Sequence, residues 1–151
     1  NEKKKIMDPL TVKKLLHQLI LGTAKIHEKR IVHRDLKPAN IFWIRIVILI
    51  KNLVNLKIAD FGLARTYSIL QDPTPLGRYA LVQAPEILLG ALEYSTPIDM
   101  WAIGCIFAEM VIQKPLFEGT SDGDQINRIF RYLGIFYINS GTPKNIVWPG
   151  V

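Results

Sequence analysis

The sequence has little cysteine, an excess of basic over acidic side chains, and no hydrophobic run of membrane-spanning length. Its one cysteine, Cys105, excludes an intramolecular disulfide framework and a zinc site built from several cysteines, and fits a reducing compartment. The longest apolar runs, 41–50 and 101–112, are shorter than the roughly 20 residues that a membrane-spanning helix needs. No apolar stretch of secretory-signal length opens the chain. We therefore expect an intracellular protein with no membrane partner.

The basic residues are spread along the chain rather than gathered on one segment. The 151 residues include 19 Lys and Arg against 13 Asp and Glu, a formal net charge of +6. A nucleic-acid interface needs a basic stripe interleaved with aromatic side chains, and we find none, so we expect no nucleic-acid partner. With 49% hydrophobic residues, the composition is that of a globular chain of one domain or part of one.

Two amphipathic or apolar helices are predicted by their start signals and apolar spacing. Asp8 followed by proline predicts a helix that runs to about Lys29. Thr96 followed by proline predicts a second helix to about Ile112, with Asp99 completing a capping box. This second helix is apolar nearly all round, which predicts a place at the centre of the core.

Other segments predict a last helix and a small β patch. We expect a helix over 121–133, closed by Gly134. Its core-facing residues are predicted to be Ile126, Ile129, Phe130 and Leu133. Residues 41–50 are β-branched and predict a strand or a hairpin, 56–59 a second short strand, and 60–85 a long loop. The expected fold class is mainly α with a small β patch (α+β).

Three short motifs follow one another in a fixed order. HRDLKPAN (33–40) lies in the loop after the first helix, DFG (60–62) follows a short strand, and APE (84–86) ends the long loop. Each motif alone is a weak signal, but together they form the catalytic half of the protein-kinase signature. The finer matches are ADFGLAR (59–65), APEILLG (84–90), YSTPIDMW (94–101) and GCIFAE (104–109). With these motifs the chain resembles the cyclin-dependent kinases, which are Ser/Thr protein kinases.

The resemblance implies transfer of the γ-phosphoryl group of ATP to a Ser or Thr hydroxyl of a protein substrate, with Mg²⁺. By resemblance, Asp35 would accept the proton of the substrate hydroxyl and Lys37 would lie beside the transferring phosphate. Asn40 and Asp60 would supply the oxygen ligands that Mg²⁺ prefers. Phe42 would form the floor beneath the adenine.

The resemblance also assigns four supporting residues. His33 and Phe61 would pack together and set the geometry of the DFG segment. Asp99, besides its expected helix-capping role, would anchor the backbone of the catalytic loop from beneath. Glu86 would pair with an arginine further along the chain.

A regulatory role is implied for the long loop. Thr74 lies where cell-cycle members of the family carry an activating phosphothreonine, and Arg34 and Arg65 would bind that phosphate. The alternative is that Thr74, within DPTP (72–75), is only a turn residue.

Several departures from the family pattern affect the expected function. The chain begins at the helix that opens the C-terminal lobe, so we expect 1–151 to be part of a kinase domain that lacks the N-terminal lobe and the last helices. The spacing from Asp35 to Asp60 is longer than usual, YALVQ (79–83) replaces the family's Thr-x-Trp-Tyr-Arg, and 135–140 looks inserted.

These departures leave alternatives open. We expect little activity from the chain alone, a cyclin partner only for a full-length parent, and a nuclear or cytoplasmic location. The alternative is a non-catalytic, degenerate kinase-like module, or the product of a decayed or misprocessed gene. The sequence leaves open the cell-cycle or transcriptional branch.

Overall fold

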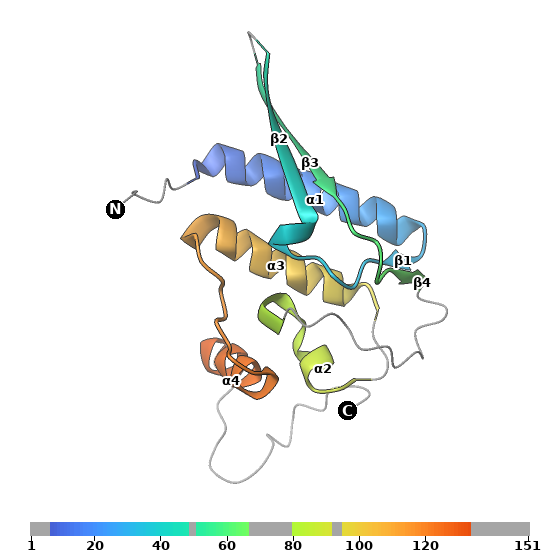
Figure 1. Cartoon of the computed structure of the whole chain (residues 1–151), viewed down its shortest axis with the longest axis vertical. Coiled ribbons are helices and arrows are strands. Elements are labelled where there is room, and N and C mark those ends of the chain that lie inside the picture. The colour runs from blue at the N-terminus through green and yellow to red at the C-terminus, as the bar shows by residue number, and fades with distance from the viewer. Residues whose placement is uncertain (1–6, 49–50, 67–79, 92–94, 134–151) are drawn as a thin grey trace.

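The computed structural model describes residues 7–48, 51–66, 80–91 and 95–133 (Figure 1). In chain order its elements are α1 (Pro9–Glu28), β1 (Ile31–Val32), the 3₁₀ turn η1 (Pro38–Asn40), β2 (Ile41–Ile48), β3 (Lys51–Ile58), β4 (Arg65–Thr66), the 3₁₀ turn η2 (Ala80–Val82), α2 (Pro85–Leu88), α3 (Pro97–Ile112) and α4 (Asp122–Tyr132). Helices dominate and the strands form two small two-stranded sheets. The expected class, mainly α with a small β patch, is confirmed.

Helix α1 starts and ends where the sequence predicts. The carboxylate of Asp8 accepts hydrogen bonds from the backbone N–H groups of Leu10 and Thr11, at 3.0 and 3.1 Å. The Thr11 hydroxyl donates to the same carboxylate, and this bond is the main reason that the pKa of Asp8 is lowered. The buried face of the helix is formed by Val12, Leu15, Leu19 and Thr23, spaced three or four residues apart.

Helix α3 begins at the predicted residue, but its predicted capping box is wrong. Thr96 has helical backbone angles and its side chain makes no capping hydrogen bond. The Asp99 carboxylate is turned into the protein and accepts bonds from the backbone of the HRDLKPAN loop (33–40) instead. Buried backbone N–H groups of that loop compete for the carboxylate, because leaving them unpaired costs more than leaving a helix end open to water.

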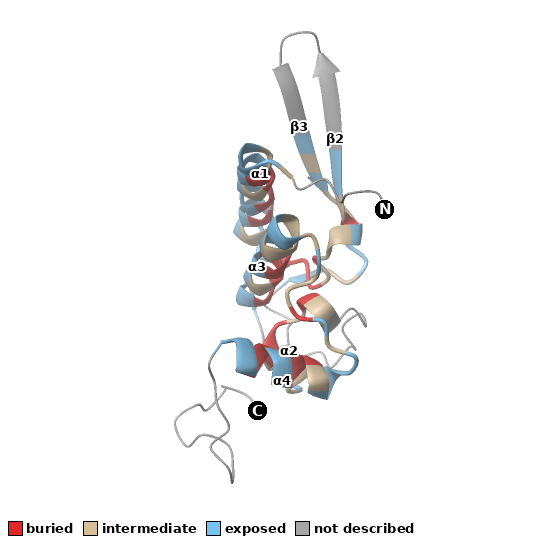
Figure 2. Cartoon of the chain, turned by 90° about the vertical axis from the view of Figure 1, so that its left-hand side faces the viewer, coloured by how far each residue is buried: buried red, intermediate tan, exposed pale blue. Residues whose placement is uncertain are grey.

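The prediction that α3 lies at the centre of the core holds for only one of its faces. The buried face comprises Ile98, Asp99, Ala102, Ile103, Cys105 and Ile106. Large apolar side chains elsewhere on the helix are exposed in the described part of the chain: Met100, Phe107, Val111 and Ile112. Helix α3 lies alongside α1. Figure 2 shows that both helices carry buried and exposed positions.

Helix α4 packs against α2 and the 3₁₀ turn η2. Ser121 caps it by accepting a hydrogen bond from the Asp124 N–H at 3.2 Å. The predicted core residues Ile126, Ile129 and Phe130 are buried, and they join the main cluster with Leu19, Leu36, Ile103, Ile106 and Phe117. Leu133, also predicted to face the core, is 54% exposed because α4 ends one residue earlier. Gly134 lies outside the described residues.

The β patch is longer than the sequence predicts. Strands β2 and β3 form an antiparallel hairpin whose register runs without interruption from Ile41↔Ile58 to Ile48↔Lys51. Residues 41–48 form one strand, so the strand alternative for the first run is confirmed and the hairpin within that run is not. The second strand begins at Lys51 rather than near residue 56. Strands β1 and β4 pair at Ile31↔Thr66 and Val32↔Arg65.

The long loop predicted over 60–85 contains β4, η2 and the first residue of α2. Residues 67–79 lie outside the described part, as does the inserted segment expected at 135–140. Among the described residues, no helix combines the length and apolar character needed to cross a membrane.

Candidate active site

Three side chains of the HRDLKPAN segment form a hydrogen-bonded cluster. Lys37 Nζ donates to Asp35 Oδ2 at 2.8 Å. The turn η1 brings Asn40 back toward Asp35, so that Asn40 Nδ2 donates to Asp35 Oδ2 at 3.1 Å and to the Asp35 carbonyl at 2.9 Å. The other carboxylate oxygen of Asp35, Oδ1, has no hydrogen bond to any residue in the described ranges. One oxygen is therefore held in place and the other remains available to accept a proton.

A buried histidine joins this loop to the DFG segment. His33 is fully buried, and its Nε2 lies 3.1 Å from the Ala59 carbonyl. The Asp35 backbone N–H points to its Nδ1 at 3.4 Å. These two bonds require the neutral ring with its hydrogen on Nε2, since one nitrogen donates and the other accepts. The ring also packs on Phe61, with centroids 4.8 Å apart.

A backbone hydrogen bond joins the segment that carries Asp60 to the HRDLKPAN loop (33–40). The Ala59 N–H donates to the Asn40 carbonyl at 3.0 Å, which places Asp60 one residue beyond a direct bond to the loop. Asp60 is exposed, and its Oδ1 accepts a 3.3 Å hydrogen bond from the Gly62 N–H. Asp60 and Arg34 both have positive φ, 63° and 72°. Such conformations cost about 1 kcal/mol or more for a residue with a Cβ, and they persist only where the surroundings enforce them.

Asp99 stabilises the backbone conformation of the HRDLKPAN loop at His33 and Arg34. Only 1% of it is exposed, and its two oxygens accept bonds from the His33 N–H at 2.8 Å and the Arg34 N–H at 2.9 Å. A third donor is His27 Nε2, at 2.8 Å from Asp99 Oδ2. Sequence reasoning missed His27, which lies in the last turn of α1. No local signal marks it, because its partner is 72 positions away.

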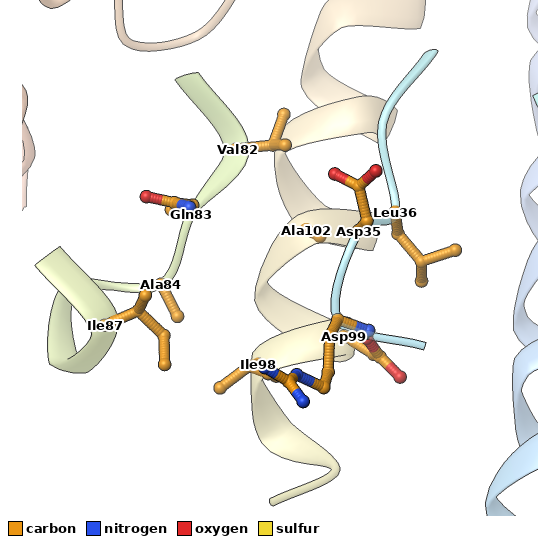
Figure 3. A pocket seen from close by; sticks show the side chains of 10 residues that line it. Asp35, Leu36, Val82, Gln83, Ala84, Ile87, Ile98, Asp99 and Ala102 are labelled. Carbon is orange, nitrogen blue, oxygen red and sulfur yellow. Dashed lines mark hydrogen bonds between the residues drawn. The ribbon is translucent and has the colours of Figure 1, made fainter. Parts of the chain in front are cut away.

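A pocket lies between the catalytic loop, α3 and the segment that precedes α2. Its lining residues are Arg34, Asp35, Leu36, Val82, Gln83, Ala84, Ile87, Ile98, Asp99 and Ala102. Figure 3 shows Asp35 on one side of this pocket and Val82 and Gln83 on the other. Four of the ten lining residues, Arg34, Asp35, Gln83 and Asp99, are polar or charged, and the cavity is small.

Comparisons with known proteins agree with this geometry. A family model described as the protein kinase domain matches residues 1–148. The chain belongs to the protein kinase family. It is 48% identical over 143 residues to mouse cyclin-dependent kinase 11B and 47% identical over 143 residues to human cyclin-dependent kinase 11A. Each alignment covers 94% of this chain and 16% of the relative, so the chain spans about one sixth of these proteins.

A solved structure supports the same assignment. The chain superposes on the yeast RNA Pol II CTD kinase CTDK-1 complex with a TM-score of 0.72 and 38% identity, over 85% of this chain and 40% of that one. The chain is thus a member of the cyclin-dependent group of Ser/Thr protein kinases, and the described residues are part of the kinase fold. The resemblance read from its motifs is confirmed.

Within this kinase fold, the remaining site residues are spread around the cluster. Phe42 follows Asn40 by two residues on β2, and its side chain is 58% exposed. Glu86, half-buried in α2, has no side-chain hydrogen bond or ion pair with any described residue. Neither Phe42 nor Glu86 makes a hydrogen bond or a ring contact with the Asp35–Lys37–Asn40 cluster in the described ranges.

The two arginines expected to bind a phosphothreonine differ in their exposure to solvent. Arg34 is buried beside the pocket, whereas Arg65 is exposed on β4 and donates to the Ala64 carbonyl at 2.9 Å. The pairing of Arg65 with Val32 brings its strand next to the catalytic loop. Thr74 itself lies outside the described residues, so its regulatory role stays a prediction.

Proposed function

We propose that this chain carries the catalytic half of a cyclin-dependent Ser/Thr kinase that transfers the γ-phosphoryl group of ATP to a protein hydroxyl. The observation that carries the proposal is the Asp35 carboxylate, which Lys37 and Asn40 hold at Oδ2 and to whose Oδ1 no described residue donates a hydrogen bond. Phosphoryl transfer needs positioning and charge neutralisation more than covalent chemistry. A carboxylate fixed at one oxygen provides the positioning, and a lysine beside it provides the charge neutralisation.

In this proposal Asp35 Oδ1 orients the substrate hydroxyl and accepts its proton as the phosphoryl group is transferred. Lys37 contributes a positive charge next to the developing negative charge on the phosphate oxygens. Its bond to Asp35 Oδ2 holds the carboxylate and the ammonium group in place. The peptide around this hydroxyl lies over the surface between the loop that carries Asp35 and the segment that carries Val82 and Gln83.

The donor set fits Mg²⁺ as a partner of the nucleotide. Asn40 uses its amide nitrogen to bond Asp35, which leaves its oxygen available, and Asp60 keeps one carboxylate oxygen free of the Gly62 N–H. No group of three or more His, Cys, Asp or Glu side chains that could bind a metal occurs in the described segments. Magnesium is commonly held by one or two protein side chains plus phosphates and water, so Asn40 and Asp60 suffice. The bound ion would neutralise phosphate charge.

ATP, the protein substrate and a cyclin belong to the proposal for the longer protein, which would act in the nucleus or cytoplasm. Phe42 is exposed on β2 and available to contact the adenine. The 151 residues contain no glycine-rich phosphate-binding loop and no preceding strand lysine. We therefore expect background activity from this chain alone and full activity only where a nucleotide-clamping half is present.

A metal titration of the chain tests the site directly. Mn²⁺, used as a paramagnetic substitute for Mg²⁺, should broaden the NMR amide signals around Asn40 and Asp60 at millimolar concentration. Asp60→Asn should abolish the broadening, and Asp122→Asn, an exposed carboxylate on α4, should leave it unchanged. Broadening that is unaffected by Asp60→Asn would contradict the metal assignment.

A kinase assay tests the base. In the longer gene product, Asp35→Asn should reduce peptide phosphorylation at least a hundredfold, with Asp122→Asn at the level of the unaltered protein. Equal activity of Asp35→Asn and the unaltered protein would refute the role of Asp35.

A second candidate function, a non-catalytic kinase-like module, is favoured by one observation. Gln83 lines the pocket where the family has an arginine that shapes the substrate site. If the longer gene product shows no ATP- and Mg²⁺-dependent rise in melting temperature, this alternative is preferred.

A further inference from the structure

The side chain of His27 on α1 reaches the buried carboxylate that holds the HRDLKPAN loop. His27 lies in the last turn of the helix, just before the chain turns into β1 (Figure 1). Its side chain is 16% exposed, and its Nε2 lies 2.8 Å from Asp99 Oδ2. With a hydrogen on Nε2, the ring donates to this carboxylate oxygen. The end of α1 is thus joined to α3 by a polar contact beside the loop.

Three donors from two segments share the Asp99 carboxylate. Oδ2 accepts the Nε2–H of His27 and the backbone N–H of His33, both at 2.8 Å, and Oδ1 accepts the N–H of Arg34 at 2.9 Å. Two of these donors belong to the loop that the carboxylate holds, whereas the His27 donor comes from outside it. A buried carboxylate needs such bonds, because burial removes the water that would otherwise solvate it. The His27 donor therefore stabilises the carboxylate and fixes its direction independently of the loop.

The direction of this carboxylate affects Asp35 through one intervening residue. Arg34 has a φ of 72°, a left-handed conformation that a residue with a Cβ keeps only where its surroundings enforce it. The bond from the Arg34 N–H to Asp99 Oδ1 stabilises this conformation. Asp35 is the next residue, so a change of backbone conformation at Arg34 turns its carboxylate relative to Lys37 and Asn40.

We propose that His27 is a positioning residue for phosphoryl transfer, which holds the Asp99 carboxylate in the direction that places Asp35. The proposal rests on the proposed function of Asp35 as the acceptor of the substrate proton. In the described ranges, His27 makes no hydrogen bond to the Asp35–Lys37–Asn40 cluster. It therefore acts on the reaction through Asp99 and does not itself touch the reacting groups.

A purely structural role for His27 has different consequences. A basic side chain in the last turn of a helix interacts favourably with the helix dipole, and Lys25 occupies the same turn. If that were the whole role, removal of the ring would lower stability and leave the activity of the folded protein unchanged. Removal of a positioning residue instead lowers kcat with little change in KM, because ATP and the peptide still bind.

Three substitutions on α1 separate the N–H donor from the rest of the ring. His27→Gln keeps a donor, since the amide nitrogen of glutamine is as many bonds from the backbone as imidazole Nε2. His27→Leu keeps apolar volume and removes the donor. His17→Leu is the matched control, because His17 is exposed on the same helix.

A kinase assay of the longer gene product compares these variants. His27→Leu should lower kcat about 10- to 100-fold at nearly unchanged KM, as misplacement of a catalytic group does. His27→Gln should retain most of kcat, and His17→Leu all of it. A lower melting temperature of His27→Leu with unchanged kcat would show a structural role only and would overturn the proposal.

Added imidazole tests the donor without relying on one replacement side chain. His27→Ala leaves a space that opens to solvent, because the native side chain is partly exposed. Millimolar imidazole should restore kcat to His27→Ala, whereas N-methylimidazole, which has no N–H in its neutral form, should not. Equal loss of kcat in His27→Gln and His27→Leu, with no rescue by imidazole, would show that ring packing matters rather than the N–H group.

Amide hydrogen exchange in the 151-residue chain separates this proposal from the proposed function. The N–H groups of His33 and Arg34 should exchange faster in His27→Leu than in His27→Gln and His17→Leu. If Asp35→Asn is inactive while His27→Leu has the kcat of the unaltered protein, the positioning role fails and the proposed function stands. If Asp35→Asn is fully active while the exchange rates differ as expected, the proposed function fails and the anchoring of the loop by His27 stands.

Discussion

Replacement of Asp99 by alanine should destabilise the chain more than any other single carboxylate change in the described segments. The carboxylate is 1% exposed and accepts the backbone N–H groups of His33 and Arg34 and the Nε2–H of His27. Alanine leaves two buried backbone donors unpaired, each at a cost of about 1–3 kcal/mol. The expected loss is therefore about 2–6 kcal/mol, a large part of the ~5–15 kcal/mol that stabilises a typical domain.

Asparagine at position 99 should cost about half as much. Its one carbonyl oxygen accepts a single donor, while its NH₂ group faces the other N–H and cannot accept it. Urea denaturation measures both losses as a shift of the midpoint at constant slope. Amide hydrogen exchange of His33 and Arg34 should accelerate in both variants. The control is Glu118→Ala, an exposed carboxylate, which should change stability by less than about 0.5 kcal/mol.

The reasoning fails on either of two results. A loss below about 1 kcal/mol for Asp99→Ala would show that water or another group replaces the carboxylate. Unchanged amide exchange at His33 and Arg34 would show that the backbone conformation of these two residues, left-handed at Arg34, does not depend on Asp99 of α3.

Three further outcomes follow from local geometry. Burial raises the pKa of Cys105 from 9.0 to about 12, so alkylation of this thiol at pH 8 should be about 1000-fold slower in the folded than in the unfolded chain. The stability that the buried thiol contributes is present below pH 9 and is lost as the pH rises toward 12, and urea midpoints measured over a pH series test this loss. Thr96→Ala should cost less than about 0.5 kcal/mol because its side chain caps nothing, whereas Ser121→Ala should cost about 1 kcal/mol, and equal losses in thermal melts would contradict the capping geometry. Gly104→Ala should stabilise α3 by about 1 kcal/mol, because the added methyl group meets open space. Gly119→Ala should destabilise the chain by about 1–3 kcal/mol, because the new Cβ would lie 2.6 Å from the Cα of Gln125. A change of stability with the same sign in both variants would show that these packing distances do not control the outcome.

The helices could be predicted from the sequence because their signals are local. Asp8 and Ser121 stand next to the backbone groups they cap, and apolar spacing fixes which face is buried. The role of Asp99 in α3 could not be derived in that way. Its position predicts a cap, but its partners are 65 and 66 residues away in the catalytic loop. A buried carboxylate with distant donors is set by tertiary structure, which overrides the local preference.

The candidate site shows the same division. The order of the three motifs predicts which residues matter, but not how they touch. The Asp35–Lys37–Asn40 cluster is local to one turn and follows from the segment itself. The contribution of His27 and the bond between Ala59 and Asn40 connect separate segments, so a single sequence does not reveal them.

The extra residues between the HRD and DFG motifs are accommodated in the β2–β3 hairpin. Each residue added to β2 pairs with one added to β3, so extra length creates rungs farther from the base. At the base, Ile41 remains paired with Ile58, and Ala59 remains bonded to Asn40. The segment that carries Asp35 and Asn40 is therefore joined to the segment that carries Asp60 through that base, whatever the length of the arm. Removal of the outer rungs should therefore leave the Mn²⁺ response of Asn40 and Asp60 unchanged. Loss of that response would show that the arm as well as the base positions these two residues.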